Sequence, residues 1–493
     1  DQLRVAVTGQ RDTVEEASQT LLGADAMLRV AAGTYFKTEI AQTRGPGFAQ
    51  SNSVDGGLSF TDITNPGTSQ TAQAWRTELA VDFAELAHRA GDAGALSAYF
   101  EHFDQGFSSA GRLMADETER WGASFAVPLG LDGKIAAKFD QITSAALGRS
   151  QTGTADFAQK WGAFGASIGL RYEDRAPGLL YNSVQSGQRL DAAVQFEVRP
   201  ANSAVHGYAF GQATLDRDTG RARNNRGGVG IGYELTDRMT LAGEISGGDG
   251  GIGADIHVNH RLAEGSEAYA GFLLSPDRTD LGSDVQNIFT RSDRGTLTVG
   301  ARHRFSDALS IHGESRSGIG GSAPSLTRSF GLNFAPTNEL SFTGSVENGQ
   351  IDDATTGLFR RFAASAGVGY ASDRVRFSSS VEMRSEHGAA VDQSVWLLRN
   401  DASLKLSPDW RAIGRLNMAF ADNDSPSIRA AEYTEAVAGM AYRPVNNERL
   451  NALFRVMYYE DMGPVGQATG SGQTQTPKQT STVLSMDVSY DLS

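Results

Sequence analysis

The alternation of hydrophobic and polar positions is clearest over residues 226–248, RGGVGIGYELTDRMTLAGEISGG. Val229 and Ile231 stand at alternate positions before a central Thr-Asp dipeptide, and Leu241 and Ile245 follow it. Residues two apart on a strand share a face, so this stretch predicts a β-hairpin with one apolar face. The other face carries glycine, small hydroxyls and carboxylates, which suit a wet space better than a protein core.

A hairpin that is apolar outside and polar inside, repeated many times, is typical of a transmembrane β-barrel. The sequence therefore predicts an all-β fold, a large antiparallel transmembrane β-barrel spanning residues 1–493. A soluble repeat β-protein is the main alternative, and it predicts apolar residues on both faces of many strands.

From Leu190 onward, short turns and long loops alternate with a period of roughly 35 residues, as expected for barrel hairpins. Short turns are expected at residues 200–203, 236–237, 262–266, 306–307, 336–338, 372–373, 407–409 and 445–447. Long polar loops are expected at residues 216–225, 276–294, 386–392, 421–430 and 463–479. Short turns at one end and long loops at the other are typical of an outer-membrane barrel, whose short turns face the periplasm.

The alternation assigns side chains to two faces. The predicted lumen-facing residues are Glu234, Glu244, Arg302, Arg304, Glu314, Glu347, Arg376, Glu382, Arg411 and Arg415. The predicted lipid-facing residues are Val229, Ile231, Tyr233, Leu241, Phe305, Phe342, Phe377 and Phe454. Charges on the inward face of consecutive strands would destabilise a dry core. In a water-filled lumen they either order water and bias solute passage or form cross-strand ion pairs that stiffen the wall.

Aromatic residues recur beside the short turns, at Tyr233, Phe305, Phe334, Tyr370, Trp410 and Tyr442. This position fits a periplasmic aromatic girdle, although aromatic residues favour strands in any case.

The first 200 residues are less regular, above all residues 1–50. The capping-box pattern at residues 12–15 indicates a short helix, or a loop with one helical turn. Residues 75–86 fit a helix or a strand, and the neighbouring strands favour a strand. No turn can be placed between Gly153 and Asp174.

Counting strand-like runs gives roughly 24 to 26 strands and leaves open whether the barrel closes within this chain. Sixteen to eighteen strands already leave an aqueous channel, and a 22-stranded lumen is normally plugged. A barrel of this size therefore predicts a plug, contributed by long loops, another segment or a periplasmic partner protein.

Composition narrows the function classes. The chain has 57 glycines and no cysteine among 493 residues, and its mean hydropathy is -0.32. No run of eighteen apolar residues occurs, which argues against a transmembrane helix. The net charge of -14 argues against a nucleic-acid partner.

Candidate catalytic and metal-binding motifs are weak. No Gly-x-Ser-x-Gly stands between a strand and a helix, so no catalytic residue is predicted and an esterase or protease barrel is disfavoured. His257 and His260 are the one close histidine pair, but three residues apart on a strand they face opposite ways. No metal site and no cofactor are expected.

Three hairpin phrases, RGGVGIGYELTDRMTLAGEISGGDGG, WLLRNDASLKLSPDWRAIGRLN and AYRPVNNERLNALFRVMYYEDM, carry a resemblance. Residues 190–493 resemble the C-terminal β-barrel region of very large proteobacterial outer-membrane proteins. The resemblance implies residence in the bacterial outer membrane and a large pore or anchor, and it implies no site residues.

Two functions remain open from the sequence. The first is a large conduit for export or uptake of a bulky substrate, with a plug or partner. The second is a structural membrane anchor for a surface or periplasmic β-domain outside this chain. Either protein would contact outer-membrane lipid and lipopolysaccharide.

Overall fold

The computed structural model describes most of the chain. The described residues are 2–14, 17–46, 48–52, 61–63, 70–109, 112–114, 116–144, 148–178, 186–274, 295–319, 324–353, 357–423, 432–446, 449–460, 467–468 and 480–490. Within these ranges, no helix has the length and apolar composition needed to cross a membrane.

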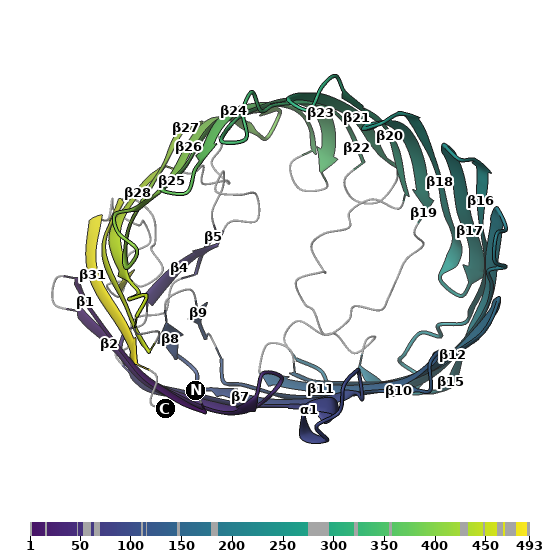
Figure 1. The fold of residues 1–493 in the computed structure, drawn as a ribbon, viewed down its shortest axis with the longest axis horizontal. Helices are drawn as coiled ribbons and strands as arrows, with labels where there is room; N and C mark the ends of the chain where they lie inside the picture. The colour runs from purple at the N-terminus through teal and green to yellow at the C-terminus, as the bar shows by residue number, and fades with distance from the viewer. Residues whose placement is uncertain are drawn as a thin grey trace.

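The chain forms one antiparallel β-barrel of 26 strands, which confirms the predicted fold class (Figure 1). Each strand pairs with its neighbours in chain order, and β1 (Leu3–Val14) pairs with β31 (Thr480–Tyr490) to close the ring. The barrel thus closes within this chain, which the sequence left open.

The first half of the barrel consists of β1, β2 (Ala17–Ala31), β3 (Thr34–Gly45), β6 (Gln70–Asp82), β7 (Ala95–Phe103), β10 (Thr118–Leu129), β11 (Gly133–Ser144), β12 (Gly148–Trp161), β13 (Phe164–Arg175), β14 (Gly187–Val198), β15 (Val205–Arg217), β16 (Arg226–Thr236) and β17 (Met239–Gly248). The second half consists of β18 (Gly251–Ala263), β19 (Ser266–Leu274), β20 (Gly295–Arg304), β21 (Leu309–Ile319), β22 (Ser325–Phe334), β23 (Leu340–Asp353), β24 (Gly357–Ala371), β25 (Val375–Gly388), β26 (Asp392–Lys405), β27 (Trp410–Asn423), β28 (Tyr433–Tyr442), β29 (Leu450–Glu460) and β31.

The smaller elements lie in the connections. They are β4 (Phe48–Asn52), β5 (Thr61–Ile63), β8 (Ser108–Ser109), β9 (Arg112–Leu113), β30 (Gln467–Ala468) and the one-turn helix α1 (Phe83–Leu86). β30 pairs with β4, and β4 pairs with β5, in an inner sheet that belongs to no part of the wall. Figure 1 shows β4 and β5 of this inner sheet and the β8–β9 hairpin inside the outline of the barrel.

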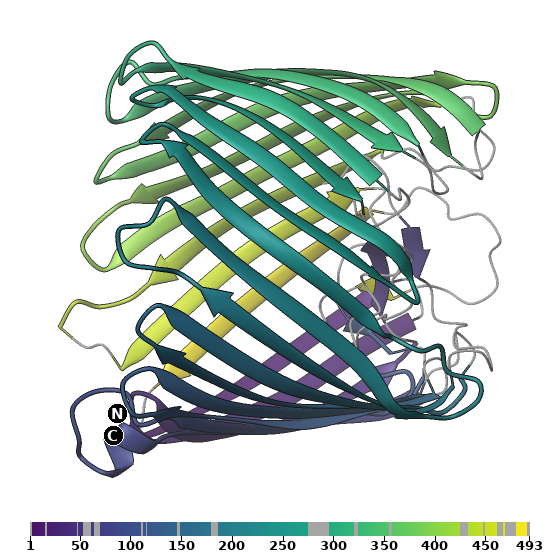
Figure 2. The same cartoon turned by 90° about the vertical axis from the view of Figure 1, so that its right-hand side faces the viewer.

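Short turns gather at one end of the barrel, and the other end, called here the long-loop end, carries residues 218–225 and the connections that contain β4, β5, β8, β9 and β30 (Figure 2). Most of the long loops predicted at 276–294, 421–430 and 463–479 lie outside the described residues. The eight predicted short turns each fall between two strands, as the gap from Thr236 to Met239 illustrates. One predicted long loop is wrong, because β25 extends to Gly388 and β26 begins at Asp392, with the Gly388 amide donating to the Val391 carbonyl. Figure 2 places both termini and α1 at the short-turn end.

The β8–β9 hairpin identifies the inner face of the wall. Phe107 and Met114, which flank this hairpin, pack with Phe103 of β7 and Ala74 of β6 in a buried cluster. Because register pairs Ala74 with Phe103, and each neighbouring strand continues the same alternation, the inner face can be followed around the whole barrel.

The N-terminal region differs from the expectation. Residues 3–45 form three long paired strands, so the less regular segment predicted over 1–50 is largely ordinary wall. The predicted helix or helical turn near residues 12–22 is wrong, because Gln10 pairs with Leu21 and Val14 with Ala17 in a tight hairpin. Backbone pairing along the whole of β1 overrides the local capping signal.

The ambiguous residues 75–86 are a strand as far as Asp82 and then a turn of helix. The Asp82 carboxylate accepts from the amides of Ala84 (2.8 Å) and Glu85 (3.1 Å), which caps α1. The Glu85 carboxylate accepts from the Gly33 amide at 2.9 Å, and this bond ties α1 to the β2–β3 turn. The missing turn between Gly153 and Asp174 lies between β12 and β13, after Trp161.

Glycines on the inner face make room for tyrosines. Register places Gly230 between Tyr208 and Glu244, and the Tyr208 hydroxyl donates to the Glu244 carboxylate at 2.5 Å across the glycine. The same arrangement recurs at Tyr99–Gly122–Asp140 (2.9 Å) and Tyr269–Gly300–Glu314 (2.6 Å). Each triplet joins three consecutive strands by a side-chain hydrogen bond in addition to the backbone ladder.

Gly230→Ala should destabilise the barrel, since a Cβ there would lie 2.3 Å from Cζ of Tyr208. The ring must swing away and lose its bond to Glu244, and overpacking of this kind costs about 1–3 kcal/mol. Urea unfolding in lipid vesicles measures the loss. Gly211→Ala is the control, because nothing lies within 4 Å of that position, and equal stability of the two variants would contradict the packing role of Gly230.

Candidate functional site

The inner wall is the candidate functional site. Register places all ten predicted lumen-facing residues on the face that carries Ala74 and Phe103. The apolar residues Val229, Ile231, Tyr233, Leu241, Phe342, Phe377 and Phe454 lie on the opposite face. Phe305 follows β20 and packs edge-on against His303, 4.4 Å between ring centroids.

Several inward charges form ion pairs between neighbouring strands. Arg302 lies 3.3 Å from Glu267, and Arg415 donates to Asp401 at 2.9 Å. Glu382 accepts from Arg399 at 2.8 Å. These contacts fit the cross-strand interpretation of the inward charges, and they leave the side chains half-exposed to the lumen.

A hollow of about 600 Å³ near the short-turn end brings two of the predicted residues together. Arg376 and Arg415 line it with Asp401 and Arg455. Arg376, Asp401 and Arg415 thus alternate in sign over three consecutive strands, β25 to β27, and Arg455 of β29 donates to Asp487 of β31 at 2.8 Å.

Five buried charges and the partly exposed Arg171 form an arginine cluster, defined here as Arg171, Glu173, Arg175, Arg189, Asp191 and Arg221. Glu173 is 0 % exposed and contacts all four guanidinium groups. Its Oε2 lies 3.3 Å from Arg175 and 3.8 Å from Arg189, and it accepts from Arg221. Arg189 also donates to Asp191 at 2.7 Å.

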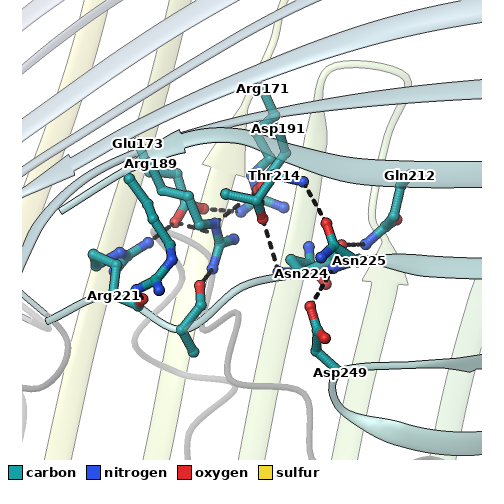
Figure 3. Close-up of polar contacts among 12 residues, drawn as sticks. Arg171, Glu173, Arg189, Asp191, Gln212, Thr214, Arg221, Asn224, Asn225 and Asp249 are labelled. Carbon is teal, nitrogen blue, oxygen red and sulfur yellow. Dashed lines mark hydrogen bonds and ion pairs between the residues drawn. The ribbon is translucent and has the colours of Figure 1, made fainter. Parts of the chain in front are cut away.

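The chain brings this cluster together by bending a loop onto the wall. Arg171, Glu173 and Arg175 alternate along β13, and register sets Glu173 beside Arg189 of β14. Arg221 belongs to residues 218–225, which connect β15 and β16 at the long-loop end (Figure 3).

A hydrogen-bond network fixes residues 218–225 against the strands. Thr214 donates its amide to Asn225 (2.9 Å), accepts from the Asn224 amide (2.8 Å) and donates its hydroxyl to Asp191 (2.8 Å). Asn225 in turn donates to Asp249 at 3.0 Å in the next turn at this end of the barrel (Figure 3). The loop is therefore part of a rigid rim.

Charge balance explains why the cluster holds the loop. Four guanidinium groups meet two carboxylates, and buried charges are tolerated only when paired and hydrogen-bonded. Burial, together with the nearby Arg175 guanidinium, lowers the pKa of Arg221 from its ordinary value. The Glu173 carboxylate opposes this shift, and its contact with Arg221 adds an ion pair to the hydrogen bonds that hold the loop.

A second buried carboxylate lies at the same end on β25. Glu386 accepts from Arg361 at 2.7 Å and from Gln393 at 2.5 Å, and Arg384 lies 3.6 Å away. Beside it, Val395 and Leu397 are buried in a small apolar cluster. The long-loop rim is thus anchored at two places on the wall.

Sequence reasoning missed the arginine cluster because the turn after Trp161 could not be placed. The signal was present in the phrase RYEDR, where Arg171, Glu173 and Arg175 stand at alternate positions and so share one strand face. His257 and His260 lie on opposite faces, as predicted. Over the described residues, no group of three or more metal-ligating side chains occurs.

No protein-family model and no curated protein matches the chain. Solved structures of similar shape include the ferric-catecholate import receptor Fiu from E. coli K12 (9% identity, 99% of this chain and 81% of that chain covered, TM-score 0.47). The FrpB iron transporter from Neisseria meningitidis (10% identity, 100% of this chain and 82% of that chain covered, TM-score 0.45) and the copper transporter OprC (10%, 99% and 80%, 0.46) show a comparable similarity.

The architecture of the barrel indicates the membrane in which the protein resides. A closed antiparallel barrel with an even number of strands and an apolar outer face is the form of bacterial outer-membrane proteins. This chain is an outer-membrane β-barrel of a Gram-negative bacterium. The resemblance to very large proteobacterial proteins remains a prediction.

Glu173→Gln should destabilise the long-loop rim, because it removes the anion that contacts four guanidinium groups. Breaking a buried charge network in this way costs about 3–5 kcal/mol. Urea unfolding measures the loss of stability, and proteolysis within residues 218–225 shows whether the loop is released. Glu267→Gln, at the exposed pair with Arg302, should change stability by less than about 1 kcal/mol. Similar losses in both variants would refute the special role of Glu173.

Proposed function

We propose that the barrel is a large conduit for export or uptake of a bulky substrate, with a plug or a periplasmic partner protein. The observation that carries this proposal is a 26-stranded ring whose inner face is polar and charged. Strands about 4.8 Å apart and tilted by about 40° give a backbone diameter of about 50 Å.

The width of the lumen supports the presence of a plug or a partner protein that narrows it. Barrels of about 22 strands are normally plugged, since an open lumen of that width would leak. The β8–β9 hairpin and the inner sheet β4–β5–β30 already occupy part of the lumen (Figure 1). They are the elements of this chain that we expect to narrow the path and to meet a partner.

The same inner elements favour a second candidate, a structural membrane anchor for a β-domain outside this chain. A lumen filled by its own segments would hold the barrel rigid and pass no solute. We expect neither function to involve enzymatic activity, a metal or a cofactor.

Planar-bilayer conductance with neutral polymers of graded size separates the two functions. A conduit should give channels that exclude only large polymers, and replacing residues 46–69, which contain β4 and β5, by a short linker should raise the conductance several-fold. Shortening the connection that contains α1 is the control, because it lies at the other end and outside the lumen (Figure 2). Absence of conductance in all three proteins would favour the anchor.

We further propose that the outer face contacts outer-membrane lipid and that the long-loop end lies beside lipopolysaccharide. Leu241→Arg, on the outer face of β17, should then cost roughly 2–4 kcal/mol near the bilayer midplane. Thr240→Arg, on the inner face of the same strand, should be tolerated. Folding yield and urea unfolding in lipid vesicles compare the two, and equal tolerance would exclude the proposed lipid contact.

A further inference from the structure

The outer face of β22 to β26 changes from apolar to polar near the long-loop end. One register row over these strands consists of the apolar residues Phe330, Val346, Ala364, Met383 and Trp396. The next row toward the long-loop end contains Arg328 and Asn348, and the row after it contains Gln350 and Arg360. An outer-membrane barrel carries an apolar band between two polar interfaces, so this change is expected at the outer interface.

Four side chains form an outer polar patch, defined here as Arg328, Asn348, Gln350 and Arg360. Arg328 is the register partner of Asn348, and Gln350 is the register partner of Arg360. All four residues are exposed. Strands about 4.8 Å apart and residues about 3.3 Å apart along a strand set the Cα atoms of the two arginines about 12 Å apart. Both long side chains can therefore reach one bound molecule.

The two arginines of the patch have no acidic partner in the part of the chain that the structure describes. Neither Arg328 nor Arg360 makes an ion pair or a side-chain hydrogen bond there. Asp352 stands two residues beyond Gln350 on the same face of β23, and it forms an ion pair with neither arginine. The patch therefore presents two uncompensated positive charges on the outer surface.

Other charged side chains beside the patch are paired within the chain. Arg361, which follows Arg360 but lies on the inner face, donates to Glu386 at 2.7 Å. On the outer face, His387 is the register partner of Arg360 on β25 and is hydrogen-bonded to Asp392 at 2.6 Å. The same strands thus place a carboxylate beside other cations, which makes the absence of one at the patch specific.

Position in the membrane determines which anion fits. A guanidinium on the lipid face destabilises a barrel at the bilayer midplane, and the cost falls toward the interface. Arg328 lies three residues after the start of β22, and Arg360 lies three residues after the start of β24, so both are close to the long-loop end. Phosphate oxygens of lipid headgroups lie at that level, and a guanidinium binds them through two parallel charge-assisted hydrogen bonds.

The apolar row beside the patch extends the site to acyl chains. Phe330 follows Arg328 by two residues on the same face and is 64 % exposed. Val346 precedes Asn348 by two residues and is 44 % exposed. A free phosphate ion would use the arginines alone, whereas a phosphate carried by a lipid would also cover this row. Charge and exposed apolar surface side by side therefore favour a lipid.

We propose that the outer polar patch binds the phosphate groups of a lipid in the outer leaflet, with the phosphorylated headgroup of lipopolysaccharide as the ligand. Arg328 and Arg360 donate to phosphate oxygens, Asn348 and Gln350 donate to other headgroup oxygens, and the acyl chains contact the adjacent apolar row. This inference rests on the proposed position of the long-loop end beside lipopolysaccharide, and it names the residues that make the contact.

Binding of lipid A, the phosphorylated anchor of lipopolysaccharide, tests the site. The full chain in maltoside micelles, whose headgroups carry no phosphate, is titrated with lipid A that bears two phosphates, and native mass spectrometry counts the bound lipid. Arg328→Gln with Arg360→Gln should weaken binding about tenfold or more, because charge-assisted hydrogen bonds to two guanidinium groups are lost. Dephosphorylated lipid A should bind the natural chain and this variant equally.

The matched control removes the same charge at the opposite end of the barrel. Arg374→Gln with Arg443→Gln changes two exposed arginines in the short-turn connections, and it should bind phosphorylated lipid A as the natural chain does. Urea unfolding in the same micelles should give equal stability for all three proteins, since none of these side chains is buried. An equal loss of binding in the control would overturn the proposal, because general charge attraction would then explain the binding.

The outcomes separate the site from the proposed lipid contact. Destabilisation by Leu241→Arg, together with unchanged lipid A binding in the patch variant, would leave the lipid contact standing and overturn the site. Tolerance of Leu241→Arg would instead remove the lipid contact, whatever the patch variant does. Inorganic phosphate that binds as tightly as lipid A would overturn the assignment to a lipid. Equal binding of phosphorylated and dephosphorylated lipid A by the natural chain would overturn the role of phosphate.

Discussion

Closure of the backbone hydrogen-bond network is the constraint on which this fold depends. A bilayer core offers no water to an unpaired amide or carbonyl, so the wall must be a ring in which each strand is paired on both sides. The 26 strands satisfy this rule by pairing in chain order, and the last strand returns to the first. Side chains are then free to differ on the two faces, since the backbone alone holds the ring.

Because side chains differ between the two faces of the wall, part of the fold could be predicted from the sequence. The two-residue alternation and the short turns are local signals, and they identified the faces and hairpins from Leu190 onward, as the hairpin around Thr236 illustrates. The prediction of a helical turn in the N-terminal region failed because the capping pattern near Asp12 is also a local signal. Pairing of Gln10 with Leu21 is decided instead by the neighbouring strand. Closure is a property of the whole ring, so the last hairpin alone could not reveal it.

For the candidate site, the sequence predicted the face on which each side chain lies, but not which residue that side chain contacts. Alternation gives the face of Arg415 or Glu382, but which carboxylate lies within reach depends on register, as with the Arg415–Asp401 bond of 2.9 Å. The arginine cluster was harder still, because Arg221 comes from a loop and joins Glu173 across 48 residues of sequence. Strand patterns carry no information about where a loop folds back.

The long-loop rim and the contact between β1 and β31 are held by different interactions. At the rim, Glu173 and Glu386 are buried among guanidinium groups, and removal of either anion would leave less negative charge to compensate those cations, so these places resist movement. Between β1 and β31, the described residues share two register pairs, and the inner sheet links the connections that precede β31 and follow β3. The rim is therefore held by buried side-chain charges, whereas closure of the ring depends on backbone pairing.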